Sequence, residues 1–505
     1  MARGAGIVFI GTIIARIFGY SLRVALKRYL GLDDFGLVAT GVVVVEISSM
    51  LALMGLQQAV ARFIAYHRSQ HEYDKVRGTL KAGLSIGIMN SLFIAVLVYF
   101  ISSGLAINVF HKPGLVDILH HFWLIIPLYA VTLLSASILR GFKNMAGMIM
   151  AQQVGRNLFV LIAFGTLALL GFKLTSAIYG YLIGFFLTAL VSALLAFRTI
   201  PFDLLNRTKT TGMTREILMY SWPLVFATLL WFLIGRTDTL FLASYVASDQ
   251  VGIYNAVLPL AQFVLVTPQS FAMIFMPLIS GVFAQGDRQG LRHIYLITSK
   301  WLLMFTLPIY LPIVIFAKPL LVLFFGPDTA PGTLALQLLA TGFFVNAIVG
   351  PASMTLSADA KTKLLLLNTT IAFMINIFLN ILLVPKLSII GSAWASSLAN
   401  ASAHITAAIE SYFLYRILSF RKVMLKVVTI AFVSVLLTLG LNHLLHLTQN
   451  LPGLFLISGF LVIFYLTGLL LTGCLDQNDL TVIEAIEGKF GVKFGFLRRF
   501  IRRSQ

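Results

Sequence analysis

Five arginines stand inside long apolar segments of this sequence, where a charged side chain is unexpected. A guanidinium group is charged at every accessible pH, and its planar fork of donors fits the paired oxygens of a phosphate. A charge at the centre of a bilayer costs roughly 2.5–3.5 kcal/mol on insertion scales, so it must face water or a partner. The pattern predicts a cationic cavity that binds an anion such as a pyrophosphate. The five residues are Arg16, Arg23, Arg62, Arg156 and Arg236.

Arg16 and Arg23 form the pair with the most informative spacing. Residues seven apart on an α-helix are rotated by about 700°, so these two side chains point the same way, about 10.5 Å apart along the axis. We expect Arg16 and Arg156 near the middle of the bilayer and Arg23 in its outer half. The alternative for each is a structural ion pair. Arg62 is close to the headgroups, and snorkelling explains it equally well.

Three acids also fall within apolar segments, namely Glu46, Asp238 and Glu410. A carboxyl group at Glu46 or Asp238 could titrate or bind a coupling cation, either H⁺ or Na⁺. The alternative is that both acids neutralise neighbouring arginines. Five cations against three acids leave an excess of two positive charges, which favours an anionic ligand. Glu410 is six residues from Arg416, and we expect it at the membrane interface.

The composition makes lipid the solvent for most of this chain. Of its 505 residues, 59% are hydrophobic and only 11% are charged, and the mean hydropathy is +0.94. A soluble protein of this length could not bury so much apolar surface, so we expect an all-α polytopic membrane protein. The net charge of +19 would suggest nucleic acid in a soluble chain, but basic inner loops explain it here.

Signals of catalysis or cofactor binding are absent from the sequence. It contains no nucleotide-binding loop of the G-x-x-x-x-G-K-[ST] type, no G-x-S-x-G elbow and no H-E-x-x-H motif. The single cysteine, Cys474, excludes a disulfide framework and a thiol-based metal cluster. His443 and His446 have a spacing that suits a metal, but without a third ligand nearby they are better explained as interfacial histidines. We expect no metal, no cofactor and no enzymatic activity, and a monomer that functions alone.

Apolar runs long enough to cross about 30 Å of hydrocarbon recur along the whole chain. Most breaks between them carry Gly, Pro, Asp or Lys. We expect about fourteen transmembrane helices, near residues 5–29, 36–65, 79–103, 117–139, 145–171, 175–197, 217–245, 251–283, 294–317, 333–357, 364–385, 390–415, 427–444 and 453–474.

Apart from the five arginines described above, the basic residues lie in the loops or near the ends of the spans, and they are unevenly distributed. With the N-terminus in the cytoplasm, the inner segments hold 26 Lys and Arg residues and the outer segments hold 6. This bias over short loops predicts a multi-pass protein of the cell membrane with both termini cytoplasmic. The tail KFGVKFGFLRRFIRRSQ mixes basic with apolar residues, and we expect it to lie on the anionic inner leaflet as an amphipathic anchor.

An internal repeat divides the chain. LGLDDFG at 30–36 reappears in outline as VASDQVG at 246–252, an offset of 216 residues. Matches at nearly the same offset recur along the following spans, and they place Arg236 opposite the turn of the first span that holds Arg23. We expect the two lobes to hold the substrate between them and to rock against each other. The expected parts are a six-helix lobe at 1–205, a second at 206–420, two extra helices at 421–475 and a basic cytoplasmic tail at 476–505.

The sequence resembles the multidrug/oligosaccharidyl-lipid/polysaccharide exporter superfamily, and within it the Wzx-type flippases of O-antigen and other polysaccharide units. The resemblance rests on ARIFGYSLR in the first span, LGLDDFG at the first outer turn and GLQQAVARFIA at 55–65. It covers the whole length, since two six-helix lobes plus two helices fit that superfamily. Arg16, and by position Arg23, match arginines that line the cavity of the related lipid II flippases. There an acid follows the second arginine, whereas Val24 follows Arg23 here, which favours the polysaccharide branch.

The resemblance implies a function as a flippase. A lipid-linked oligosaccharide on a polyprenyl (pyro)phosphate would be turned from the inner to the outer leaflet by alternating access, driven by H⁺, Na⁺ or the membrane potential. Alternatives within the superfamily are a lipid II flippase and a multidrug or cation antiporter, whose cationic substrates an arginine-rich cavity would repel. A membrane polysaccharide polymerase or ligase is the alternative from another class, although such enzymes usually have larger outer loops.

Overall fold

The computed structural model describes residues 2–201, 204, 210–417, 422–475, 479 and 487. Over these residues the chain forms helices and no strand. This agrees with the all-α expectation, since a helix satisfies its backbone polar groups internally where lipid offers no partner.

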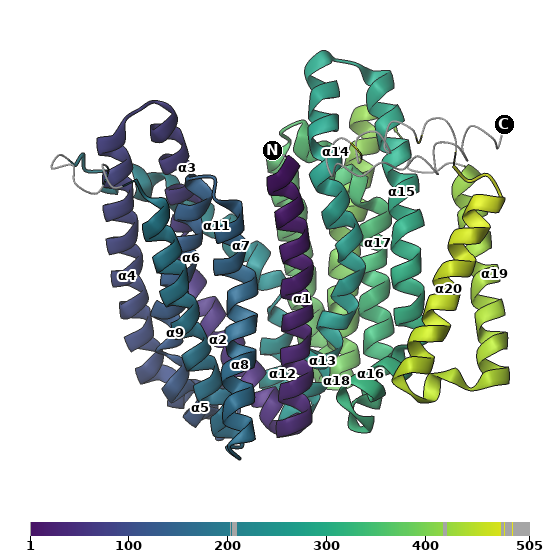
Figure 1. Ribbon diagram of the computed structural model, residues 1–505, viewed down its shortest axis with the longest axis horizontal. Helices are drawn as coiled ribbons and strands as arrows, with labels where there is room; N and C mark the ends of the chain where they lie inside the picture. The colour runs from purple at the N-terminus through teal and green to yellow at the C-terminus, as the bar shows by residue number, and fades with distance from the viewer. Residues whose placement is uncertain are drawn as a thin grey trace. The chain divides into compact units, whose positions relative to one another are not determined.

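The chain folds into two compact units, each a bundle of long helices (Figure 1). The N-terminal unit is Gly6–Asn255, and the C-terminal unit is Ala256–Gln505 together with Met1–Ala5. The helices that begin in the N-terminal unit or before it are α1 (Ala2–Leu30), α2 (Leu32–Leu53), α3 (Leu56–Ser69), α4 (Tyr73–Gly104), η1 (Leu105–Val109), α5 (Leu115–Phe122), α6 (Ile125–Gly141), α7 (Met145–Ile149), η2 (Met150–Val154), α8 (Gly155–Leu169), α9 (Leu174–Thr199), α11 (Thr214–Ile234), α12 (Thr237–Tyr245) and α13 (Ser248–Ala261).

In the C-terminal unit, long helices α15, α17 and α18 are followed by the antiparallel pair α19 and α20, which lie side by side (Figure 1). The expected lobe boundary near residue 205 stays a prediction. In the structure, α11 and α12 follow that boundary in the chain and pack with α2, α3 and α4 in the N-terminal unit. The helices here are η3 (Gln262–Leu265), α14 (Val266–Gln285), α15 (Arg288–Ile315), α16 (Ala317–Phe325), η4 (Pro327–Gly332), α17 (Thr333–Ala358), α18 (Thr362–Tyr415), α19 (Lys422–Leu445), η5 (Leu447–Gln449) and α20 (Leu451–Leu471).

Among the described residues, 10 helices are long and apolar enough to cross a membrane, or 11 if the bent pair α5 and α6 forms one span. The chain is therefore a multi-pass membrane protein, while the count of fourteen stays a prediction. Two expected spans are not among these helices. In α1 the described side chains begin at Ile10 and include four basic residues, and the expected span 217–245 is interrupted between Ile234 and Thr237.

Helix α18 accounts for two expected spans at once. As a straight helix its 54 residues would extend about 81 Å, far more than the hydrocarbon thickness. The backbone leaves the helical conformation at Ser388, with φ 52° and ψ −130°. Hydrogen bonds of 2.9 Å between Ser392 and Asn380 and of 2.7 Å between Asn368 and Glu410 then join the two halves in reverse order. The chain therefore turns back on itself at Ser388, and Glu410 is bonded within the bundle.

The two copies of the internal repeat pack directly on each other within the N-terminal unit. A Cβ atom on Gly36 of α2 would overlap the carbonyl oxygen of Ser248 in α13, and one on Gly252 would overlap that of Leu32. The two glycines occupy the same place in their repeats. The absence of side chains at both positions lets the helix backbones cross at contact distance.

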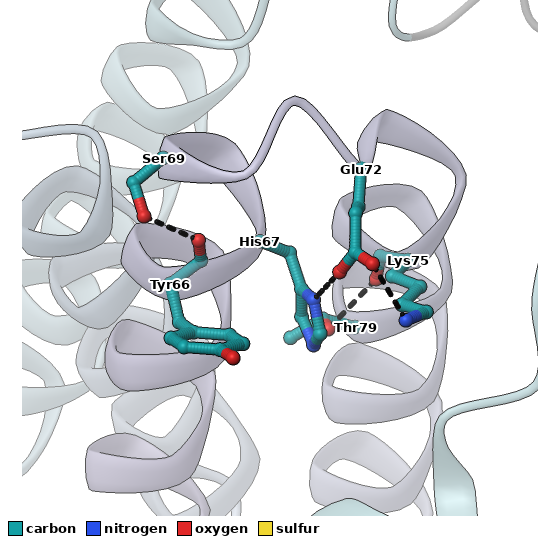
Figure 2. Close-up of polar contacts among 6 residues, drawn as sticks. All are labelled: Tyr66, His67, Ser69, Glu72, Lys75 and Thr79. Carbon is teal, nitrogen blue, oxygen red and sulfur yellow. Dashed lines mark hydrogen bonds and ion pairs between the residues drawn. The ribbon is translucent and has the colours of Figure 1, made fainter.

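The turn between α3 and α4 is held by a small polar network (Figure 2). His67 and Lys75 both point at the carboxylate of Glu72, with Nδ1 of His67 2.6 Å from Oε2 and Nζ of Lys75 2.9 Å from Oε1. The hydrogen bonds from Lys75 and from His67 lower the pKa of the Glu72 carboxyl. The network stabilises the turn that connects α3 to α4, at the expected cytoplasmic end of both helices.

A buried ion pair ties the segment after α20 to α15 within the C-terminal unit. Nζ of Lys300 lies 2.6 Å from Oδ2 of Asp479, and both side chains are fully buried. The indole of Trp301 donates to the other carboxylate oxygen at 2.7 Å. Because both oxygens of Asp479 are bonded, the segment is anchored by directional contacts as well as by apolar packing.

We expect Asp479→Asn to lower the free energy of unfolding by about 3–5 kcal/mol, because it leaves the buried ammonium of Lys300 without its carboxylate. Thermal unfolding of the full chain in detergent measures the effect. The double variant Lys300→Met with Asp479→Leu removes both charges and should recover most of the loss. An unchanged midpoint for Asp479→Asn would contradict the anchoring role.

Candidate functional site

Glu46 of α2 lies at the centre of a charged cluster inside the N-terminal unit. It is 4% exposed. Nη1 of Arg156 donates to its Oε1 at 3.0 Å, and Nη2 of Arg236 lies 2.7 Å from its Oε2. The second contact is an ion pair whose N–H is not aligned with the oxygen as a hydrogen bond requires. One carboxylate thus holds two guanidinium groups, each about a quarter exposed.

Irregular backbone positions both arginines. Arg156 is the second residue of α8, directly after the π-helical turn η2, and such turns are frequent at functional sites. Arg236 stands in the break between α11 and α12, where its φ of −128° is not helical. Within a membrane, such breaks are tolerated where the backbone lies inside the protein or beside a water-filled cavity.

Aromatic rings complete the setting of the two arginines. Nη1 of Arg156 also donates to the hydroxyl of Tyr129 in α6 at 3.1 Å, and its guanidinium lies 5.6 Å from the centre of that ring. Phe185 of α9 packs edge-on against Tyr129 at 5.4 Å. The guanidinium of Arg236 lies 5.7 Å from the ring of Phe232. These contacts stabilise both guanidinium groups beside aromatic rings.

Arg23 of α1 belongs to the same cluster. Its charge interacts with those of Arg236, Arg156 and Glu46, and with Tyr181 of α9. Among the residues that the structure describes, no side chain forms a hydrogen bond or ion pair with Arg23. The described part of the cluster therefore contains three guanidinium groups and one carboxylate, which pairs with two of them, and this leaves two positive charges in excess. This is the electrostatic character of an anion-binding site.

Comparison with known proteins shows the family of this chain. The profile of the family described as polysaccharide biosynthesis protein matches residues 1–283, more than half of the sequence. The chain belongs to this family. A second profile, MatE, matches residues 223–382. The lipid II flippase MurJ of Bacillus subtilis (strain 168) is 24% identical to this member over 441 residues, which are 79% of this chain and 80% of that one.

Solved structures show the same fold as this family member. The inward closed conformation of a lipid II flippase MurJ superposes with a TM-score of 0.68 and 18% identity, covering 92% of this chain and 98% of that one. A multidrug resistance MATE transporter in its inward-facing conformation gives 0.60 and 16%, with coverage of 79% and 94%. The two profiles and the curated relative, together with this fold, identify a membrane transporter of the multidrug/oligosaccharidyl-lipid/polysaccharide superfamily, as the resemblance in the sequence implied.

The structure of this family member brings some predicted site residues together and leaves others apart. Arg156 and Arg236 meet at Glu46, and the charge of Arg23 interacts with all three. Arg62 instead lies over the ring of Tyr220 in α11, at 4.3 Å from its centre. This cation–π contact gives Arg62 a partner in α11, and a role of Arg62 in substrate binding stays a prediction.

Asp238 has a hydrogen-bond partner on a neighbouring helix, and Arg16 is placed by its helix. The hydroxyl of Tyr254 in α13 donates to Oδ2 of Asp238, and both side chains are buried. Asp238 is therefore bonded to a neutral partner rather than only to arginines. Arg16 shares a helix face with Arg23, since α1 is continuous through both positions.

The sequence reasoning missed Tyr129 and Tyr181, which come from α6 and α9. A polar hydroxyl in an otherwise apolar span was the available signal, because a buried tyrosine hydroxyl usually needs a partner. Tyrosines occur in several spans, however, so spacing alone did not single these two out.

We expect Glu46→Ala to destabilise the protein by on the order of 2–3 kcal/mol, because it leaves Arg156 and Arg236 without the carboxylate that pairs with both. Thermal unfolding in detergent measures this effect. Glu216→Ala, which removes an exposed acid at the start of α11, is the matched control and should change stability little. Equal midpoints for the two variants would show that Glu46 does not hold the cluster together.

Proposed function

We propose that this protein is a flippase for oligosaccharides linked to a polyprenyl (pyro)phosphate. It moves them from the inner to the outer leaflet of the cell membrane by alternating access, as a step of polysaccharide biosynthesis. The observation that carries the proposal is the cluster of Arg23, Arg156 and Arg236 around the single carboxylate of Glu46. A fixed positive excess inside a membrane protein suits a diphosphate, which several guanidinium groups bind together.

Family membership supports this proposal independently of the cluster. The matching profile describes polysaccharide biosynthesis proteins, and the curated relative is a flippase for a lipid-linked substrate. A cationic drug would be repelled by the arginines, which argues against the multidrug substrates named for the MATE transporter. The related proteins are transporters and not catalysts, so a polymerase or ligase has no support among them.

Lipid II is the second candidate substrate. The curated relative and a structure of the same fold are both lipid II flippases. The same cluster would bind its diphosphate, because both lipids share that group. Val24, where the lipid II flippases carry an acid, favours the polysaccharide substrate. Deletion of the gene, followed by quantification of each lipid-linked glycan in the outer leaflet, separates the two.

The proposed architecture is that of fourteen spans with both termini in the cytoplasm. It comprises a lobe at 1–205, a second lobe at 206–420 and an extra pair of helices at 421–475. The basic tail at 476–505 lies outside the described residues except for Asp479 and Glu487. The excess of basic residues in the inner segments supports the orientation. We infer that a monomer is the working form.

Transport is proposed to be coupled to H⁺ or Na⁺, with Glu46 as the principal coupling residue and Asp238 as the second. Glu46 holds Arg156 and Arg236 through its two carboxylate oxygens. A diphosphate that enters the cluster competes with this carboxylate for the same guanidinium groups. Binding of a cation by Glu46 would release the arginines to the substrate, and its departure would favour release of the substrate.

We expect Arg23→Ala to reduce transport at least about tenfold, equivalent to about 1.4 kcal/mol, because Arg23 is the cluster arginine that the carboxylate does not hold. Arg23→Lys should recover part of the activity, since an ammonium keeps the charge but loses the planar fork. Outer-leaflet glycan in a deletion strain carrying each variant is the measurement. Arg215→Ala, an exposed arginine of α11, is the control. Wild-type transport by Arg23→Ala, at equal protein level, would refute the role of Arg23.

We expect Glu46→Gln to make transport insensitive to the ion gradient, because an amide neither titrates nor carries the charge that attracts a cation. Flux into proteoliposomes with imposed pH or Na⁺ gradients, and without them, measures this sensitivity. If the variant still transports and responds to a gradient as the wild type does, the coupling site lies elsewhere.

A further inference from the structure

A second polar site opens at one end of the N-terminal unit. Three segments meet there: the start of α2, the loop from η1 to α5, and the loop from α12 to α13. They line an open groove of about 730 Å³. This volume lies within the range of about 300–1,000 Å³ that is typical of small-molecule sites. The groove contains none of the cluster residues, and the proposed function assigns it no role.

Two fixed contacts hold the walls of this groove. Nζ of Lys112, which is 8% exposed, donates to the carbonyl oxygens of Ala243 and Val246 at 2.6 Å each. The lysine thereby ties the loop before α5 to the carboxyl end of α12, where the helix dipole favours a cation. On the other side, the crossing of Gly36 with Ser248 fixes the start of α2 against α13. Walls held on both sides reduce the ordering cost of binding a ligand.

The lining suits a neutral ligand that is rich in hydroxyl groups. Asp33 presents an exposed carboxylate that accepts hydrogen bonds, and His111 and Ser248 add further polar groups. Tyr245 is 51% exposed and stacks on Phe241 with the rings 6.3 Å apart and 3° from parallel. A flat exposed ring of this kind packs against the apolar face of a sugar.

The groove also lacks the charge that a phosphate requires. No arginine is among its lining residues, and its lysine donates to two backbone carbonyls. Burial lowers the pKa of Lys112, and the nearby Asp249 opposes this shift. The groove and the arginine cluster therefore differ in the chemical group that each accepts.

Helix α2 connects the two sites. Asp33 lies in its first turn and Glu46 thirteen residues further along, so the two are about 20 Å apart. A substrate whose phosphate reaches the cluster spans that distance only if it carries several sugar units. A short glycan bound at the cluster does not extend to the groove.

We propose that this groove binds the glycan of the lipid-linked substrate and selects for glycans of several sugar units. The inference rests on the proposed flippase function and assigns to the start of α2 a role that the arginines do not have. In this proposal the arginine cluster binds the phosphate, and Asp33 and Tyr245 select for the length of the glycan.

The test compares two probes in proteoliposomes made with the full chain. One is a polyprenyl diphosphate that carries a single N-acetylhexosamine, and the other carries a neutral pentasaccharide. We expect the double variant Asp33→Asn with Tyr245→Ala to flip the pentasaccharide lipid about tenfold more slowly and the monosaccharide lipid within about twofold of the wild type. Asp117→Asn with Tyr179→Ala, an exposed acid and tyrosine outside the groove, is the matched control.

A second measurement separates this inference from the proposed function. Hydroxyl-radical labelling of Tyr245 in the wild-type chain is followed with the free pentasaccharide, with Mg²⁺ or with inorganic phosphate. Protection by the pentasaccharide alone supports the groove even if neither lipid is flipped, an outcome that refutes only the flippase function. Equal slowing of both lipids, no slowing of either, or protection by Mg²⁺ or phosphate in place of the glycan would each overturn the inference.

Discussion

The interaction on which the N-terminal unit depends is the pairing of Glu46 with two arginines inside an apolar bundle. A buried guanidinium is costly without a partner, and a single carboxylate provides one for both Arg156 and Arg236. The partners come from α2, α8 and the break before α12, so the ion pairs fix three distant parts of the chain at one point. Arg23 joins them as a charge in excess, and an anionic ligand is the natural complement.

Several departures from regular helix lie beside polar contacts. Arg236 occupies a break between two helices, Arg156 follows a π-helical turn, and α18 reverses at Ser388 beside a ladder of buried asparagine and serine contacts. In lipid, a freed backbone group must find a partner inside the protein. Such breaks are therefore confined to places where polar side chains or a wet cavity are present, and these places are also where a polar substrate can be bound.

Within the N-terminal unit, two sites of different chemistry lie along one helix. The cluster near the middle of α2 offers fixed positive charge, and the groove at its start offers a carboxylate, hydroxyl groups and an aromatic face. A lipid-linked oligosaccharide has the same division between a charged linkage and a neutral glycan. This correspondence joins the two proposals, while each depends on its own residues.

The sequence by itself determined the solvent, the fold class and most of the helices, because lipid demands long apolar helical runs that composition and hydropathy reveal. It also singled out Arg23, Arg156, Arg236 and Glu46, since charge in such runs is costly. Only the tertiary structure decided which of these residues meet. Arg62 was satisfied by the ring of Tyr220, and Tyr129 joined the cluster from α6. Such contacts depend on how helices far apart in the chain are rotated and packed against each other. The spacing of residues along one helix does not predict this packing.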